Sequence, residues 1–125
     1  MKEILFRGKR LDNGEWVYGL PYKAKYGCIS SIVNDDEERF LIFPETVGQY
    51  TGLTDKNGKK IFEGDILEDV LCGDKERYTV IFDDYCRYVL TNNGTRNYLL
   101  ARNNKDMEVI GNIYDKLCVL QETQK

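Results

Sequence analysis

The 125-residue sequence contains no histidine, and this absence removes several kinds of active site. Histidine is the usual general base for serine and cysteine nucleophiles, and it is a common ligand of catalytic zinc. The chain also lacks a Gly-x-Gly-x-x-Gly segment and a Gly-Lys-Ser/Thr phosphate-binding loop. We therefore expect a protein that is not an enzyme, has no catalytic residues and uses no cofactor.

Cysteine pairs of the Cys-x-x-Cys kind are missing as well. The four cysteines lie far apart, at Cys28, Cys72, Cys86 and Cys118. Scattered thiols are typical of small buried apolar side chains in a protein from a reducing compartment. Four thiolates on one metal ion are the alternative, but the paired spacing that such sites use is absent. The sequence predicts no metal site.

Long hydrophobic runs are also absent. No apolar run approaches the roughly 18 residues that a membrane-spanning helix needs. Residues 1–7, MKEILFR, lack the apolar stretch of about 7–15 residues that a signal peptide contains. A chain of 125 residues has the usual length of one domain. We expect a single domain that resides in the cytoplasm.

Neither sign of charge dominates the chain. It carries 18 basic and 21 acidic residues, so its net charge of −3 provides no general attraction for nucleic acid or an anionic membrane. Proline is scarce, at two residues, whereas tyrosine and phenylalanine number nine and five. Aromatic side chains favour the half-buried surfaces of β-sheets. The composition therefore favours a β-rich globular protein.

Three Asn-Gly pairs divide the sequence: Asn13-Gly14, Asn57-Gly58 and Asn93-Gly94. Asn-Gly tolerates positive φ at both residues, as the type I′ hairpin turn requires, so each pair predicts a hairpin. Strands are expected at residues 4–7, 15–20, 28–33, 39–43, 77–82, 87–91, 98–100 and 109–114. Many short strands separated by turns are typical of a small barrel or sandwich.

The expected strand at residues 15–20 alternates in character. Trp16, Tyr18 and Leu20 would share one face at a period of two. No segment has a sustained helical period, and only short helical turns are expected, near Thr46-Val47 or at residues 101–103. The expected fold class is mostly β.

Several motifs together resemble the YopX family of bacteriophage and prophage proteins. They are Gly8-Lys9-Arg10, GEWVYG at 14–19, ETVGQYTGL at 45–53, DKNGKKIFEGDI at 55–66 and VIGNIY at 109–114. The resemblance implies a β-rich chain whose later part is a small, partly open SH3-like barrel. It also implies a phage-encoded protein without an assigned activity. Within a single domain over 1–125, we expect an N-terminal β-hairpin region at 1–49 and the barrel at 50–120.

Two motifs have both a chemical and a structural interpretation. Glu63 and Asp65 are two residues apart and could act as a carboxylate pair, but Glu-Gly-Asp is also a common polar turn that leads into a strand. The segment DKNG at 55–58 resembles the start of a calcium loop, but the required Gly and Glu are missing at the sixth and twelfth positions. We interpret both motifs as turns.

The expected function is a non-enzymatic protein-interaction module, in which surplus aromatic residues bind a host or phage protein. We also expect a homo-oligomer. The candidate contact residues are Trp16, Tyr18, Tyr50, Asp55 and Asn57.

Nucleic-acid binding is the alternative function. Small barrels bind single strands by stacking bases on aromatic side chains within a basic groove. Trp16, Tyr18 and Tyr50 are the candidate stacking residues, unless they belong to the core. The candidate basic contacts are Arg7, Lys9, Arg10, Lys56, Lys59 and Lys60. The net acidity of the chain speaks against this alternative.

Overall fold

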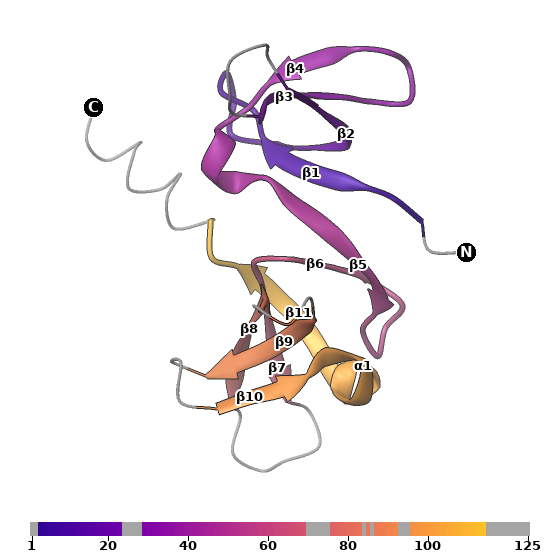
Figure 1. Ribbon diagram of the computed structural model, residues 1–125, viewed down its shortest axis with the longest axis vertical. Helices are drawn as coiled ribbons and strands as arrows, with labels where there is room; N and C mark the ends of the chain where they lie inside the picture. The colour runs from indigo at the N-terminus through magenta and orange to yellow at the C-terminus, as the bar shows by residue number, and fades with distance from the viewer. Residues whose placement is uncertain are drawn as a thin grey trace, which may run out of the picture. The chain divides into compact units, whose positions relative to one another are not determined.

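In the computed structural model of the chain, the regular secondary structure is mostly β-strand (Figure 1). The structure describes residues 3–23, 29–69, 76–83, 85, 87–92 and 96–114. The chain forms two compact units, unit 1 over Met1–Tyr50 and unit 2 over Thr51–Lys125. The single domain with regions 1–49 and 50–120 stays a prediction.

Unit 1 contains four strands, a 3-10 turn and the start of a fifth strand. The elements are β1 (Phe6–Lys9), β2 (Trp16–Lys23), β3 (Ile29–Val33), β4 (Arg39–Leu41), η1 (Pro44–Thr46) and β5 (Gly48–Thr54). Neighbouring strands pair antiparallel in the order β4-β3-β2-β1-β5. The end of β1 also returns to the end of β4, because Leu11 N donates to Leu41 O at 3.0 Å and Phe43 N donates to Lys9 O at 2.9 Å. Strands β1 to β4 therefore close on themselves.

Strand β2 of unit 1 alternates between a buried and an outward row. On β2, Val17 is buried and packs with Ile32 and Ile42, and Gly19 lies so close to β3 that a Cβ there would be 2.0 Å from Val33 O. This period of two is what a half-buried strand requires. The intervening residues of β2 therefore point to the outside of unit 1.

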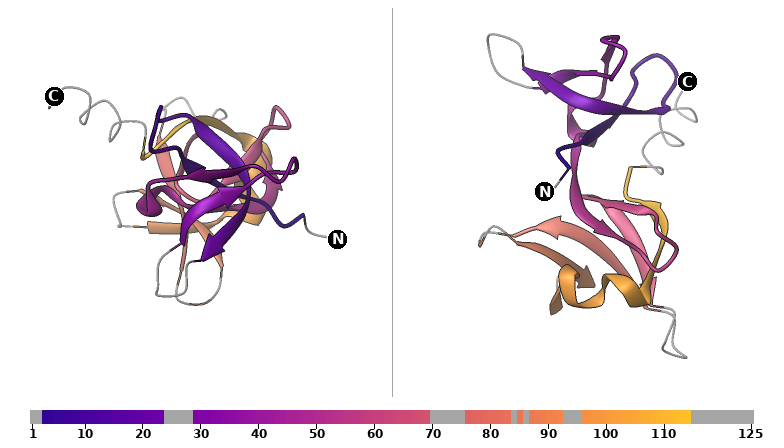
Figure 2. Two further views of the ribbon diagram at one scale, coloured as in Figure 1. Left: turned by 90° about the horizontal axis from the view of Figure 1, so that it is seen from above. Right: turned by 90° about the vertical axis from the view of Figure 1, so that its right-hand side faces the viewer.

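Unit 2 contains a five-stranded antiparallel sheet that curls around its own core (Figure 2). The elements are the end of β5, β6 (Lys60–Phe62), β7 (Asp65–Asp69), β8 (Arg77–Phe82), β9 (Tyr88–Asn92), β10 (Arg96–Leu99), α1 (Leu100–Asn103), η2 (Asn104–Asp106) and β11 (Met107–Asn112). The sheet order is β10-β9-β8-β7-β11. Its core residues are Ile61, Leu67, Tyr78, Val80, Leu90, Leu100 and Met107.

The predicted mostly-β class with a small, partly open barrel is confirmed. The predicted helical turns are confirmed as well, at η1 and α1. Within the described ranges, no helix is long and apolar enough to cross a membrane. The four cysteines, by contrast, lie outside the described residues.

The hairpin positions were predicted correctly, but the turn type was wrong at both described Asn-Gly pairs. The pairs join β1 to β2 and β5 to β6, as expected. However, Gly14 and Gly58 have positive φ, at 71° and 81°, and neither preceding asparagine does. A type I′ turn needs positive φ at both residues. The third pair, at 93–94, lies outside the described residues between β9 and β10.

Candidate functional site

The outward side chains of β2 form a row of neighbouring apolar side chains on the surface of unit 1. We call Trp16, Tyr18, Leu20 and Tyr22 the outer row of β2. Trp16 is half-buried, whereas Tyr18, Leu20 and Tyr22 are 46%, 55% and 48% exposed. Large apolar side chains in a contiguous exposed group mark interaction surfaces more often than isolated ones do. The predicted shared face of Trp16, Tyr18 and Leu20 is therefore present, and it points outward.

The outer row continues onto β3 and β4. The pairing places Tyr22 opposite Ser31 and Ser31 opposite Leu41, so these side chains share one side of the sheet. Arg39 on β4 lies over the ring of Tyr22 at 4.3 Å, and its Nε donates to Ser31 Oγ at 3.0 Å. These two contacts hold an exposed cation against the edge of the apolar surface.

The other end of the outer row is covered by two cations of β1. The Arg7 guanidinium lies 4.2 Å from the Trp16 ring centroid, and Lys9 Nζ lies 5.1 Å from it. Both cations are nearly buried, at 6% and 5% exposure. Arg7 and Lys9 therefore stabilise the position of Trp16, but they present little charge to solvent.

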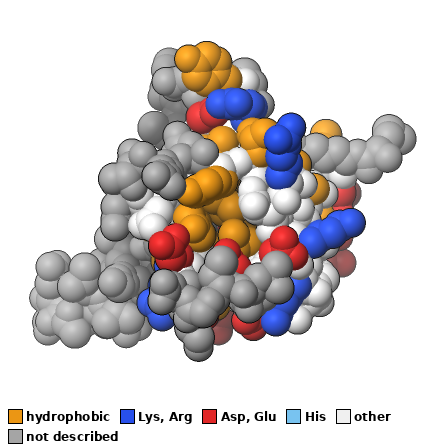
Figure 3. Space-filling model, turned by 90° about the horizontal axis from the view of Figure 1, so that it is seen from below, with side chains coloured by type: hydrophobic (Ala, Val, Ile, Leu, Met, Phe, Trp, Pro, Cys, Tyr) orange, Lys and Arg blue, Asp and Glu red, His pale blue; other side chains and the backbone are white. Residues whose placement is uncertain are grey.

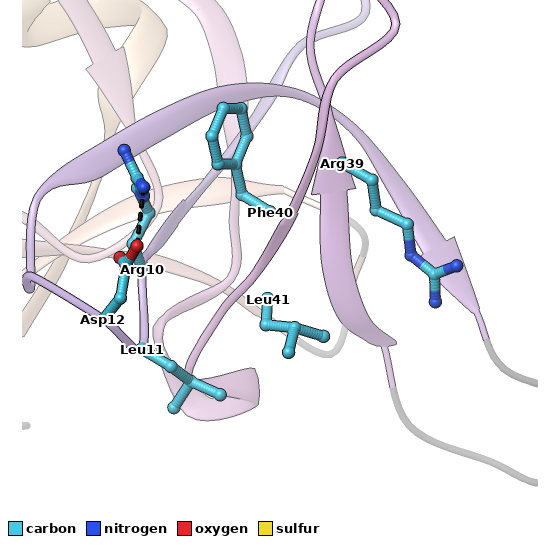
Figure 4. A pocket seen from close by; sticks show the side chains of 6 residues that line it. All are labelled: Arg10, Leu11, Asp12, Arg39, Phe40 and Leu41. Carbon is cyan, nitrogen blue, oxygen red and sulfur yellow. Dashed lines mark hydrogen bonds and ion pairs between the residues drawn. The ribbon is translucent and has the colours of Figure 1, made fainter.

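A shallow pocket of about 450 Å³ lies beside this surface (Figure 4). It is lined by Arg10, Leu11, Asp12, Arg39, Phe40 and Leu41. Leu11 and Leu41 lie side by side, whereas Arg39 points away from them (Figure 4). Arg10 is paired with Asp12 at 2.6 Å and covers the ring of Phe40 at 4.5 Å. The pocket thus combines apolar and charged side chains, and two of the charged ones, Arg10 and Asp12, neutralise each other.

The candidates in unit 2 lie in the β5–β6 turn. Asp55 is buried. Its carboxylate is nevertheless satisfied, since it accepts hydrogen bonds from the amides of Asn57 at 2.8 Å, Lys59 at 2.9 Å and Val109 at 2.9 Å. Asn57 is exposed, as are the three lysines Lys56, Lys59 and Lys60. The interpretation of this segment as a hairpin turn is confirmed.

The sequence-predicted contacts therefore divide into three groups. Trp16 and Tyr18 lie in the outer row of β2, whereas Tyr50 and Asp55 are 7% and 5% exposed and offer a partner little surface. Asn57 is exposed in unit 2. The candidate contact set as a whole stays a prediction.

The basic candidates for nucleic-acid binding are also spread out. Arg7 and Lys9 are buried and Arg10 is paired with Asp12, all in unit 1. The three exposed lysines belong to the turn in unit 2. The sequence did not single out Tyr22, although it continues the period of two from Trp16, and it carried no signal for Arg39.

The carboxylate pair of Glu63 and Asp65 has a structural role at Asp65. Asp65 is buried, and its Oδ2 accepts a bond from Phe62 N at 2.8 Å as β7 begins. Glu63 is half-buried in the preceding turn, and this burial raises the pKa of its carboxyl. The interpretation as a turn that leads into a strand is confirmed. No group of three or more Asp or Glu residues in the described ranges is placed to hold a metal ion.

Comparison with known proteins supports the fold and identifies the family. A crystal structure of protein EF1440 from Enterococcus faecalis is similar to this chain with a TM-score of 0.68 and 22% sequence identity, and the match covers 96% of this chain and 99% of that one. At this identity the likeness shows the fold alone. A search of curated proteins gave no match. The family model described as YopX protein matches residues 5–120, and the chain therefore belongs to the YopX family.

Proposed function

We propose that the chain is a non-enzymatic accessory protein that binds another protein through the outer row of β2. The supporting observation is the exposed group of Tyr18, Leu20 and Tyr22, which sits on a rigid closed sheet. Ordered tyrosines lose little conformational entropy on binding and offer both an apolar ring and a polar hydroxyl. The same surface suits self-association, so a homo-oligomer belongs to the proposal.

The phage or prophage setting and the host cytoplasm are part of the same proposal. They follow from the family resemblance, and the partner would be a host or phage protein. Exposed hydrophobic side chains also occur beside acidic and basic ones on the side of the molecule that Figure 3 shows. A mixed surface of this kind is common in protein interfaces.

Charge favours a protein partner over nucleic acid. Strand pairing defines which described residues lie on the same side of the sheet as the outer row, and none of these residues is acidic. The absence of acidic side chains there would suit a polyanion as partner. However, Arg7 and Lys9 on that side are buried, so Arg39 is its exposed cation. Affinity for nucleic acid grows with the number of phosphates that cations neutralise, and one exposed cation supplies little of it.

The test compares the wild-type chain with two double variants in affinity capture from host cells. Tyr18→Ser/Leu20→Ser removes two side chains of the outer row, and Ile4→Ser/Ile110→Ser removes two exposed apolar side chains elsewhere, at 67% and 41% exposure. We expect the first variant to lose a specific protein that the wild type and the second variant retain. Retention of every captured protein by the first variant would contradict the proposal.

The alternative is tested with labelled oligonucleotides. If the chain binds phosphates, fluorescence anisotropy should detect binding at low salt, and the affinity should fall steeply as salt is added. Binding of that kind, lost in Arg39→Gln, would replace the protein partner with nucleic acid.

A further inference from the structure

Strand β10 forms an open edge of the unit 2 sheet (Figure 1). In the sheet order β10-β9-β8-β7-β11, β10 pairs with β9, and no other strand of the described ranges pairs with its far side. Proteins usually shield such an edge with a proline, a bulge or a covering segment, because its unpaired backbone groups recruit other strands. The residues of β10, Arg96 to Leu99, include no proline, and their register with β9 has no bulge.

The opposite edge of the same sheet, β11, is shielded in two ways. A bulge interrupts its register between Val109 and Gly111. The β5–β6 turn also bonds to this strand, because Lys56 N donates to Met107 O at 3.0 Å. A second bond joins Val109 N to Asp55 Oδ2 at 2.9 Å. The two edges thus differ, and β10 is the one that can accept a further strand.

The hydrogen bonds of β8 show which backbone groups of the sheet face β10. Along an antiparallel strand, residues bond alternately to one neighbouring strand and to the other. Val80 O accepts from Gly64 N at 2.9 Å on the β7 side of β8, so Val80 does not bond to β9. Asp83 N donates to Arg87 O at 2.8 Å on the β9 side, as this alternation requires. Leu90 lies opposite Val80, and it therefore directs its N–H and C=O toward β10.

The same alternation places two residues of β10 on the open edge. Leu90 lies opposite Tyr98, so these two residues exchange hydrogen bonds. Asn97 and Leu99 consequently direct their N–H and C=O groups away from β9. The carbonyl of Leu99 is occupied, since it accepts from Asn103 Nδ2 at 2.7 Å. The edge therefore presents the N–H and C=O of Asn97 and the N–H of Leu99.

We propose that β10 pairs antiparallel with β10 of a second copy of this chain. Under two-fold symmetry, the residue beside the axis meets its own copy, so it must offer both a donor and an acceptor. Only Asn97 offers both, because Asn103 occupies the carbonyl of Leu99. The two copies of Asn97 exchange two hydrogen bonds, and the N–H of Leu99 extends the pairing. The contact lies in unit 2 and goes beyond the surface proposed for the outer row of β2.

The residue types of β10 agree with this register. It places Arg96, the one charged residue of the strand, opposite Tyr98 of the second copy, so like charges do not face each other. Tyr98 is 38% exposed and lies edge-to-face with the buried Tyr78 at 5.7 Å, and an added strand covers part of its ring. Four paired residues bury much less than the about 800 Å² per partner of a stable dimer. The dimer is therefore weak and forms at high protein concentration.

The test is the oligomeric state of the full chain under reducing conditions, measured by sedimentation velocity at increasing protein concentration. Amide hydrogen exchange, measured by NMR, is the second readout. We expect reversible dimers in which the amides of Asn97 and Leu99 exchange at least threefold more slowly than in the monomer. The amide of Tyr98 already bonds to Leu90 and should change much less. A chain that stays monomeric up to about 1 mM, or dimers without slower exchange at Asn97 and Leu99, would overturn the proposal.

Proline at the edge separates the role of the backbone from that of the side chain. Leu99 has φ at −64°, which proline adopts without strain, so Leu99→Pro removes the outward N–H alone from the backbone. Leu99→Ala shortens the same side chain but keeps the N–H, and it is the matched control. We expect Leu99→Pro to weaken the dimer at least tenfold, because each dimer loses two hydrogen bonds. Leu99→Ala should weaken it less than threefold.

Asn97→Pro is a second variant, at the axis itself, because proline is tolerated at edge positions whose N–H points away from the sheet. It should also weaken the dimer at least tenfold. Slow exchange of the Tyr98 amide shows that β10 keeps its pairing with β9 in each variant. Equal dimerisation by Leu99→Pro and Leu99→Ala would overturn the β10 pairing. Dimers lost in Tyr18→Ser/Leu20→Ser but kept in both proline variants would assign self-association to the outer row of β2 instead.

Discussion

Asp55 is the residue on which the β5–β6 turn depends, since it accepts three backbone hydrogen bonds from a buried position. We expect Asp55→Ala to lower the free energy of unfolding by about 3 kcal/mol, because it leaves amide donors without an acceptor. Urea denaturation measures the change. Asp36→Ala, at an exposed position in another turn, should change the stability by less than about 0.5 kcal/mol. Similar values for the two variants would contradict this role of Asp55.

Glu63 should make the stability of the chain depend on pH. Burial raises its pKa in the folded state above the usual 4.5, so the folded state holds the proton more tightly than the unfolded state does. The stability associated with this group is therefore present below about pH 4.5 and is lost as the pH rises through the folded-state pKa. We expect Glu63→Gln to stabilise the chain at neutral pH and to have little effect near pH 4. Chemical denaturation at both pH values measures this, and a gain that is equal at both would contradict it.

For single residues, the sequence indicates which ones matter, but it does not predict the direction in which their side chains point. Tyr18 and Asp55 were both candidate contacts, but one points outward and the other is held inside a turn. The segment Asp55-Lys56-Asn57-Gly58 predicts a turn whether its aspartate is buried or exposed. The direction of its carboxylate depends on Val109, which is 54 residues away in the sequence. Local patterns do not contain that information.

Among the elements, the approach of β2 to β3 depends on Gly19. A Cβ at this position would lie 2.0 Å from Val33 O, which is backbone and cannot rotate away. We expect Gly19→Ala to cost about 2–3 kcal/mol, as overpacking does in a close contact. Gly58→Ala is the comparison, since it has positive φ but nothing within 4 Å, and it should cost only about 1 kcal/mol. Thermal denaturation gives the order, and a larger loss for Gly58→Ala would contradict it.

The elements themselves were largely predictable because strands and turns are local. The alternation of Trp16, Tyr18 and Leu20 predicted correctly that these side chains share one face of β2, but it left open whether that face points outward. The type I′ turns were wrong, since flanking bonds such as Asp55 N to Lys59 O at 2.9 Å set a longer loop in which only the glycine needs positive φ. The return of β1 to β4 joins residues about 30 positions apart, and no pattern in the sequence predicted it.

For the whole molecule, the two hydrophobic cores lie in different units. Ile32 belongs to the core of unit 1 and Leu67 to that of unit 2, and both are completely buried. We expect Ile32→Ala and Leu67→Ala each to cost about 2–5 kcal/mol. Each should accelerate amide hydrogen exchange mainly within its own unit. Equal acceleration across the chain in both variants would show one cooperative unit instead.

The return of β1 to β4 should protect unit 1 from aggregation at high protein concentration. An open strand edge acts as a template for amyloid-like growth, because its free amide and carbonyl groups recruit further strands. Here Leu11 and Lys9 already occupy the groups at Leu41 and Phe43. Breaking this contact, for example by proline at Leu11, should shorten the lag before fibrils form.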